Sequence, residues 1–185
     1  MPSHQRSHES LSLALAGEAI LTQTAAQVTN FDAELTALAG KMLATLRAAQ
    51  GVGIAAPQVH SSKAMFIMAS HPNPRYPAAP TMAPLVLVNP EIITRSPDLV
   101  VGEEGCLSLP GCRLNIWRHR SVGVRYQDLD GIWQTAEFSG FIARIFQHEY
   151  DHLQGVTLRE RVKMPEQLSG QLSPELPGQT YGTQE

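Results

Sequence analysis

The sequence has little of what marks several large classes of protein. It contains only two cysteines, Cys106 and Cys112, which excludes a disulfide-held scaffold and favours a reducing compartment. No apolar run approaches the length of a membrane span, and residues 1–16 lack the layout of a secretory signal. The net charge is −3 without any basic run, so nothing indicates direct nucleic-acid binding. We therefore expect a cytoplasmic protein with neither a membrane nor a nucleic acid as partner; an organelle is the open alternative.

The chain is long enough for one domain with a sizeable core. Its 185 residues are 43% hydrophobic, an ordinary value for a folded protein. Apolar residues recur at steps of three and four from about Phe31 to Gln50, which predicts a packing helix. Apolar runs or alternation predict strands over 63–69, 85–88 and 121–127, a further strand beginning at 91–94, and a hairpin that turns at 128–131 and continues over 132–138.

The ends of the chain and one internal segment are expected to lie outside these elements. Residues 1–14 are predicted to be a disordered N-terminus, 15–164 the folded domain, and 165–185 a flexible tail rich in Pro, Gly, Gln and Ser. Residues 17–28 carry a weak pattern and are expected to be extended or a loop. The segment 71–84 holds five prolines and is predicted to be a long surface loop.

The stretch from Ser139 to Gly155 reads as one helix with recognisable ends. Ser139 suits the N-cap, and Gly155 suits the position just after the helix. Inside it lie His148, Glu149 and His152 in the pattern HExxH. Residues four apart share a helical face, so both imidazoles can reach one ion while Glu149 addresses a water. This pattern indicates a metal-dependent hydrolase, although a helical His pair can also be a surface feature with no ion.

A catalytic site of this kind needs three protein ligands and one open position. The third ligand could be Cys, His, Glu or Asp, and Cys106 is the outstanding candidate because Gly105 and Ser108 allow a tight backbone around it. A lone cysteine is more often an inert buried thiol, which is the alternative.

Two glycines and a run of small residues form the segment Gly51–Gln58. Such a segment indicates a backbone that something approaches closely. It is not a phosphate-binding loop, because the Gly-Lys-Ser/Thr ending is missing. A plain turn between a helix and a strand is the competing interpretation.

Three segments of this chain together resemble the signature motifs of the peptide deformylases. They are GVGIAAPQ at 51–58, EGCLS at 104–108 and QHEYDH at 147–152, in that order. The resemblance covers roughly residues 17–162. It implies a hydrolase that removes the N-terminal formyl group from N-formylmethionyl nascent peptides during protein biosynthesis and releases formate, in a bacterial cytoplasm. Proximity to the ribosome is possible, but the tail lacks the basic helix with which some members dock there.

The resemblance also implies how the chemistry is divided among residues. Cys106, His148 and His152 would hold one divalent ion, usually iron(II), with zinc, nickel or cobalt as substitutes. Glu149 would take a proton from water and later pass it to the leaving amine. Gln58 and the backbone N–H of Leu107 would stabilise the developing oxyanion.

By the same resemblance, the substrate would bind as an added strand beside the small-residue segment. We expect contacts with the substrate backbone and with its methionine side chain, from Gly51, Gly53, Ile54, Gly105, Phe141, Arg144 and Ile145. Arg144 could narrow the mouth of the pocket or reach solvent. Glu104 and Asp151 are expected to orient the ligands, for example by fixing an imidazole or pairing with Arg118. The alternative is that they are ordinary charges of a loop and of a helix face.

The sequence thus predicts an α+β domain in which antiparallel sheets surround a central metal-binding HExxH helix, with one N-terminal packing helix. Two rivals differ in class. An ordinary HExxH metallopeptidase would use a His or Glu after His152 as its third ligand, yet only Glu160 and a few carboxylates of the tail remain there. A non-catalytic descendant would bind formylated peptides without turning them over.

Overall fold

The structure is a computed structural model that describes residues 10–163. Its strands are Gly53–Ala55 (β1), Met65–Met68 (β2), Leu85–Arg95 (β3), Leu99–Cys106 (β4), Leu109–His119 (β5), Ser121–Gln127 (β6) and Trp133–Ser139 (β7). Its α-helices are Ala33–Ala48 (α1), Gly140–Leu153 (α2) and Leu158–Arg161 (α3), and two 3₁₀ turns span Ala19–Thr22 and Ala56–Val59.

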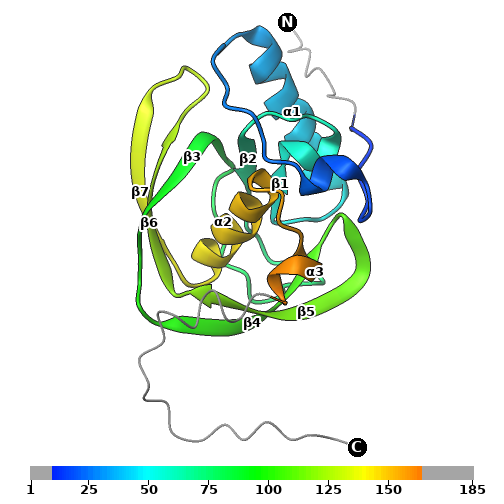
Figure 1. The fold of residues 1–185 in the computed structure, drawn as a ribbon, viewed down its shortest axis with the longest axis vertical. Coiled ribbons are helices and arrows are strands. Elements are labelled where there is room, and N and C mark those ends of the chain that lie inside the picture. The colour runs from blue at the N-terminus through cyan, green and yellow to red at the C-terminus, as the bar shows by residue number, and fades with distance from the viewer. Residues whose placement is uncertain (1–9, 164–185) are drawn as a thin grey trace, which may run out of the picture.

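Five strands form one sheet in the order β1-β2-β3-β6-β7, and β4 and β5 form a separate hairpin. Every pairing between these strands is antiparallel. Figure 1 shows α2 in the middle of the molecule, with the β4–β5 hairpin curving beneath it and α1 at the far end. The expected α+β class with antiparallel sheets and few helices is confirmed. Within residues 10–163, no helix is long and apolar enough to cross a membrane.

Strand β2 is the middle layer of the core. All four of its side chains are buried, because both faces of the strand are covered. Met65 and Ile67 join the apolar cluster that contains the buried face of α1, whereas Phe66 and Met68 join the cluster that contains α2. Successive side chains on a strand point to opposite faces, which explains why β2 is a continuous apolar run rather than an alternating one.

Both long helices begin and end where the sequence predicts, within two residues. Asp32 caps α1 by accepting a hydrogen bond from the Leu35 N–H at 3.0 Å. Ser139 occupies the N-cap position of α2, but its side chain makes no capping hydrogen bond. Gly155 has φ +70°, as the position after a helix requires.

Several strands differ from the prediction. The structure has one long strand, β3, where the sequence suggested a break at Asn89-Pro90. Asn89 adopts φ +48° at an irregularity in the β3–β6 pairing, where a proline is tolerated. The hairpin β4–β5 was not predicted for most of its length, and residues 19–22 form a 3₁₀ turn within a segment expected to be extended or a loop.

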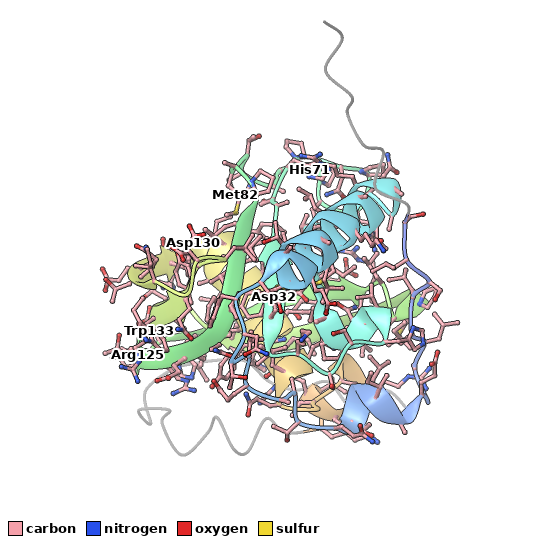
Figure 2. The ribbon with its side chains drawn as sticks, turned by 90° about the horizontal axis from the view of Figure 1, so that it is seen from above. Asp32, His71, Met82, Arg125, Asp130 and Trp133 are labelled. Atoms are coloured by element: carbon pink, nitrogen blue, oxygen red, sulfur yellow. The ribbon has the colours of Figure 1, made fainter. Side chains whose placement is uncertain are left out.

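The segment 71–84 contains no helix or strand, as expected, but it is folded on itself. The Met82 N–H donates to the Ser70 carbonyl at 3.0 Å, so the ends of the segment lie close together, on the side where Figure 2 labels His71 and Met82. Figure 2 also shows Arg125 and Trp133 together at the outer edge of the sheet, where the guanidinium carbon lies 4.8 Å from the ring centroid.

Residues 11–14, which the sequence assigns to a disordered N-terminus, pack against the rest of the chain. Ala14 is fully buried, and its N–H donates to the Gln58 carbonyl at 2.8 Å. Leu11 and Leu13 pack against the cluster around α1. Residues 1–9, predicted to be disordered, and residues 165–185, predicted to be a flexible tail, lie outside the described residues, as does Met164.

We expect the substitution Phe66→Ala to destabilise the protein by about 3–5 kcal/mol, because it leaves a cavity between β2 and α2. The Phe66 ring is fully buried and meets the Phe146 ring edge-on at 5.2 Å between centroids. The measurement is the free energy of unfolding in urea. Ile132→Ala is the control, because that side chain is 59% exposed, and it should change stability by less than about 0.5 kcal/mol. Equal effects of the two variants would contradict this account of the core.

Candidate metal centre and surrounding pocket

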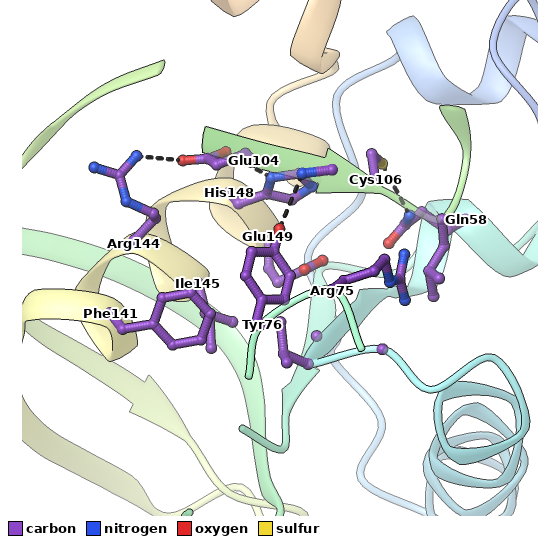
Figure 3. Close-up of a pocket in the computed structure, with 15 residues that line it drawn as sticks. Gln58, Arg75, Tyr76, Glu104, Cys106, Phe141, Arg144, Ile145, His148 and Glu149 are labelled. Carbon is purple, nitrogen blue, oxygen red and sulfur yellow. Dashed lines mark hydrogen bonds and ion pairs between the residues drawn. The ribbon is translucent and has the colours of Figure 1, made fainter. Parts of the chain in front are cut away.

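Helix α2 and the end of strand β4 bring together the three side chains that the sequence singles out as ligands. His148 and His152 lie one turn apart on α2, with ring centroids 5.1 Å apart. Cys106 is the last residue of β4. One potential ligand atom from each of these residues lies within 4.8 Å of the other two. Figure 3 shows Cys106 and His148 near each other in the upper part of the view, with the Cys106 sulfur directed toward Gln58.

The chemistry of this donor set fits a first-row divalent ion. The Cys106 sulfur lies 3.3 Å from His152 Nε2, and it is buried. Burial alone would raise the pKa of the thiol, but the neighbouring His152 and His148 imidazoles lower that pKa well below its ordinary value. A thiolate with two imidazole nitrogens is a recurrent set of three ligands for zinc and its neighbours, with a fourth position left for a water.

Glu104 fixes the orientation of the His148 ring. Its Oε2 lies 2.8 Å from His148 Nδ1, which leaves Nε2 as the nitrogen free to bind an ion. Arg118 donates to both oxygens of Glu104, at 2.9 and 3.0 Å, and Arg144 donates to Oε1 at 2.9 Å. Burial would raise the pKa of Glu104, but the charge of Arg118 and the hydrogen bonds from His148 and Arg118 hold it well below its usual range.

Asp151 extends this network away from the pocket. Its carboxylate accepts from Arg118 Nη1 at 2.6 Å and from Arg161 Nε at 2.9 Å. Arg118 thus joins Glu104 on β4 to Asp151 on α2, and Arg161 adds the short helix α3. Glu104 therefore contacts a candidate ligand directly. Asp151 instead ties α2 to β5 through Arg118 and to α3 through Arg161.

Glu149 is an almost completely buried carboxyl group in the wall of the pocket. It is 3% exposed, and among the described residues no partner hydrogen-bonds to its Oε2. Burial raises the pKa of Glu149 to about 7, against the lowering effect of the two histidines. A Cβ added at Gly53 would lie 2.5 Å from Glu149 Oε1. The glycine is therefore needed for close approach of the carboxylate, which is the role that the small-residue segment suggested.

The amide group of Gln58 is oriented by two hydrogen bonds. The Ala55 N–H donates to its Oε1 at 2.9 Å, and its Nε2 donates to the Ser108 hydroxyl at 3.1 Å. The same Nε2 lies 3.5 Å from the Cys106 sulfur. The NH₂ side of the amide therefore faces the candidate metal centre, and Leu107 lines the same pocket beside it.

One pocket contains most of the residues predicted from the sequence. Its lining includes Gly51, Gly53, Gln58, Glu104, Gly105, Cys106, Leu107, Phe141, Arg144, Ile145, His148 and Glu149. Ile54, Asp151 and His152 do not line this pocket. The Ile54 side chain is fully buried in the cluster around α1, so any contact with a substrate would come from its backbone. His152 reaches the site from behind the Cys106 sulfur.

Three lining residues were not named as site residues: Val52, which lies within the small-residue segment, and Arg75 and Tyr76, which come from the proline-rich segment. The Tyr76 hydroxyl accepts a hydrogen bond from the Gly105 N–H at 2.9 Å, and its ring lies 5.0 Å from the Phe141 ring. Arg75 donates to the carbonyls of Ala49 and Gln50 at the end of α1. A segment without hydrophobic periodicity gives no signal of where its side chains point. The sequence of this segment carries no other signal that would place Arg75 or Tyr76 in the pocket.

Comparisons with known proteins agree with this geometry. The model of the polypeptide deformylase family matches residues 11–168. Peptide deformylase 2 of Shewanella oneidensis is 61% identical over 163 residues, which cover 88% of this chain and 90% of the relative. Peptide deformylase 2 of a Nostoc species is 47% identical over 156 residues, covering 84% of this chain and 87% of that protein.

Solved structures give the same result. A class I type b peptide deformylase from Acinetobacter baumannii, solved with Met-Ala-Ser bound, has a TM-score of 0.81 and 48% identity, and the match covers 83% of this chain and 99% of that one. The peptide deformylase of Thermotoga maritima has a TM-score of 0.76 and 36% identity over 84% of this chain and 99% of its own. On the family model, the relatives and the fold together, this chain belongs to the polypeptide deformylase family.

Proposed function

We propose that this pocket removes the formyl group from the N-terminus of N-formylmethionyl nascent peptides, with Cys106, His148 and His152 holding one divalent metal ion. The observation that carries the proposal is the convergence of one sulfur and two imidazole nitrogens within 4.8 Å beside the buried carboxyl of Glu149. Membership of a metal-dependent deformylase family supports it.

Iron(II) is the proposed ion, with zinc, nickel or cobalt as substitutes, since sites of thiolate and imidazole accept several first-row metals. When bound, such an ion supplies a Lewis acid that polarises a carbonyl oxygen and makes a water molecule more acidic. The protein contributes the lowered pKa of Cys106, which provides the thiolate, and the hydrogen bond from His148 to Glu104, which fixes the imidazole.

Glu149 is the proposed general base and then the general acid. The carboxylate takes a proton from the water that attacks the formyl carbon, and the carboxylic acid returns this proton to the amine nitrogen as the C–N bond breaks. The products are formate and a peptide with a free amino group. Burial raises the pKa of Glu149 and so favours the protonated form that the second transfer requires.

The negative charge that develops on the formyl oxygen needs donors that are already in place. We assign the Gln58 amide and the Leu107 N–H to this task. The hydrogen bonds from Ala55 and to Ser108 hold the Gln58 amide before any substrate arrives, so its donor need not reorient during the reaction.

An extended peptide can bind by pairing with β1. This strand is the first in the order of the five-stranded sheet and pairs with β2 on one side, which leaves its other edge toward the pocket. Gly51 and Gly53 line the pocket on this edge, and Gly105 lines it from β4. Phe141 and Ile145 on α2 provide an apolar wall for the methionine side chain.

The roles of Glu149 and Cys106 can be separated with two variants. We expect Glu149→Ala to lower formate release from formyl-Met-Ala-Ser by about 10²–10⁴-fold while the metal content is retained. We expect Cys106→Ser to lose both the bound metal and the activity. The measurements are formate release by iron-loaded protein under anaerobic conditions and metal content by elemental analysis, with Glu149→Gln as the matched control of similar shape.

Other outcomes of this experiment would favour a rival function. A Cys106 variant that keeps its metal and cleaves internal peptide bonds would indicate an ordinary HExxH metallopeptidase. A fully metallated wild type that binds formyl-Met-Ala-Ser and releases no formate would indicate a non-catalytic binding protein.

The close contact between Gly53 and Glu149 gives a second test. We expect Gly53→Ala to lower kcat by about 10²-fold with the metal retained, because the added methyl group displaces the carboxylate from its position. Steady-state kinetics and metal content check this. Wild-type kcat in Gly53→Ala would show that the position of Glu149 is not critical, and loss of the metal would place the damage in the ligands instead.

A further inference from the structure

Arg144 makes more hydrogen bonds than a residue at the mouth of a pocket requires. It lies in the first half of α2, and its side chain is only 11% exposed. Its Nη2 donates to the Val100 carbonyl at 2.8 Å, and its Nη1 donates to the Ile116 carbonyl at 2.9 Å. With Glu104 Oε1, also at 2.9 Å, the guanidinium contacts both strands of the β4–β5 hairpin.

The guanidinium lies directly against the backbone of β4 at Gly102. A Cβ added there would lie 2.7 Å from the Arg144 Cζ atom and 2.8 Å from Nη2. This glycine does not have a positive φ, so the need for it is one of space and not of backbone conformation. A planar group with five donors can satisfy several fixed carbonyls at once, whereas an ammonium group cannot reproduce that pattern.

The hairpin needs such a link because the ligands come from two separately held elements. Helix α2, with His148 and His152, packs through an apolar face on the five-stranded sheet. Cys106 belongs to the hairpin, which is a sheet of its own. The distance from Cys106 to the histidines therefore depends on how firmly the hairpin is held against α2.

We infer that Arg144 is a positioning residue: seated over Gly102, it holds strand β4 against helix α2 so that Cys106 meets the two histidines at ligand distance. This inference rests on the proposed function. It gives Arg144 a different part from the one expected from the sequence, where it narrows the pocket or reaches solvent. A role in substrate binding would appear in KM, whereas a positioning role would appear in metal retention and kcat.

The test uses full-length protein loaded with cobalt(II), whose thiolate–metal absorption reports the ligand geometry. The variants are Arg144→Met, Arg144→Lys, Gly102→Ala and the double variant of Arg144→Met with Gly102→Ala. The control is Arg120→Met, which removes an arginine that is 61% exposed and paired with Asp98 on the surface. The measurements are the rate of cobalt release to a chelator, the absorption spectrum, and kcat and KM for formyl-Met-Ala-Ser.

We expect Arg144→Met to release cobalt about tenfold faster or more, with an altered spectrum, a lower kcat and an unchanged KM. Gly102→Ala should reproduce these changes, because its methyl group occupies the place of the guanidinium. Adding Gly102→Ala to Arg144→Met should change little further, since the space is then vacant. Arg144→Lys should restore cobalt retention only in part, and Arg120→Met should behave as wild type.

Release rates and spectra equal to wild type in Arg144→Met and Gly102→Ala would overturn the inference, as would an effect confined to KM. Should Arg144→Met not fold, Arg144→Lys and Gly102→Ala carry the same comparison. A wild-type protein that takes up no cobalt would overturn the proposed metal site itself, and the inference with it. If the wild type takes up cobalt but releases no formate, the proposed reaction is overturned. The rates of cobalt release then still test whether Arg144 positions the ligands.

Discussion

The carboxylate of Glu104 is the point through which the strands and the helix of the site are connected. It accepts from Arg118, Arg144 and His148, and so joins β5 and α2 to its own strand, β4. Removing one partner of a buried ion pair costs about 3–5 kcal/mol, although replacing a whole pair by apolar residues can be neutral. Apolar residues in these places would lack the directional hydrogen bonds. Burial of apolar surface holds two elements together, but it does not fix the angle between them.

Two kinds of interaction thus position different parts of the molecule. Apolar packing on both faces of β2 places α1 and α2 on the five-stranded sheet. Charged hydrogen bonds then place the β4–β5 hairpin against α2, with Arg118 bridging Glu104 and Asp151. The candidate ligands lie at the boundary between these two regions, one on the hairpin and two on the helix.

The same division explains which parts could be predicted from the sequence. Helix α2 and the β6–β7 hairpin follow from helical spacing and from alternation, since each has one apolar face. The β4–β5 hairpin carries the buried charges Glu104 and Arg118 within its strands, so the apolar signal of a strand is interrupted. The HExxH pattern and Cys106 could be found because residue type and spacing alone indicate metal ligands. Tyr76 was missed because only the folded segment brings it to the pocket.

Helix α2 lies at the centre of the molecule, yet it follows all seven strands that the structure describes. During synthesis, therefore, the sheet that α2 covers leaves the ribosome with one apolar face still open to water. Contacts between distant parts of the chain form slowly, and exposed apolar faces invite association. This chain can therefore complete the core between the sheet and α2 only after residue 153 has emerged.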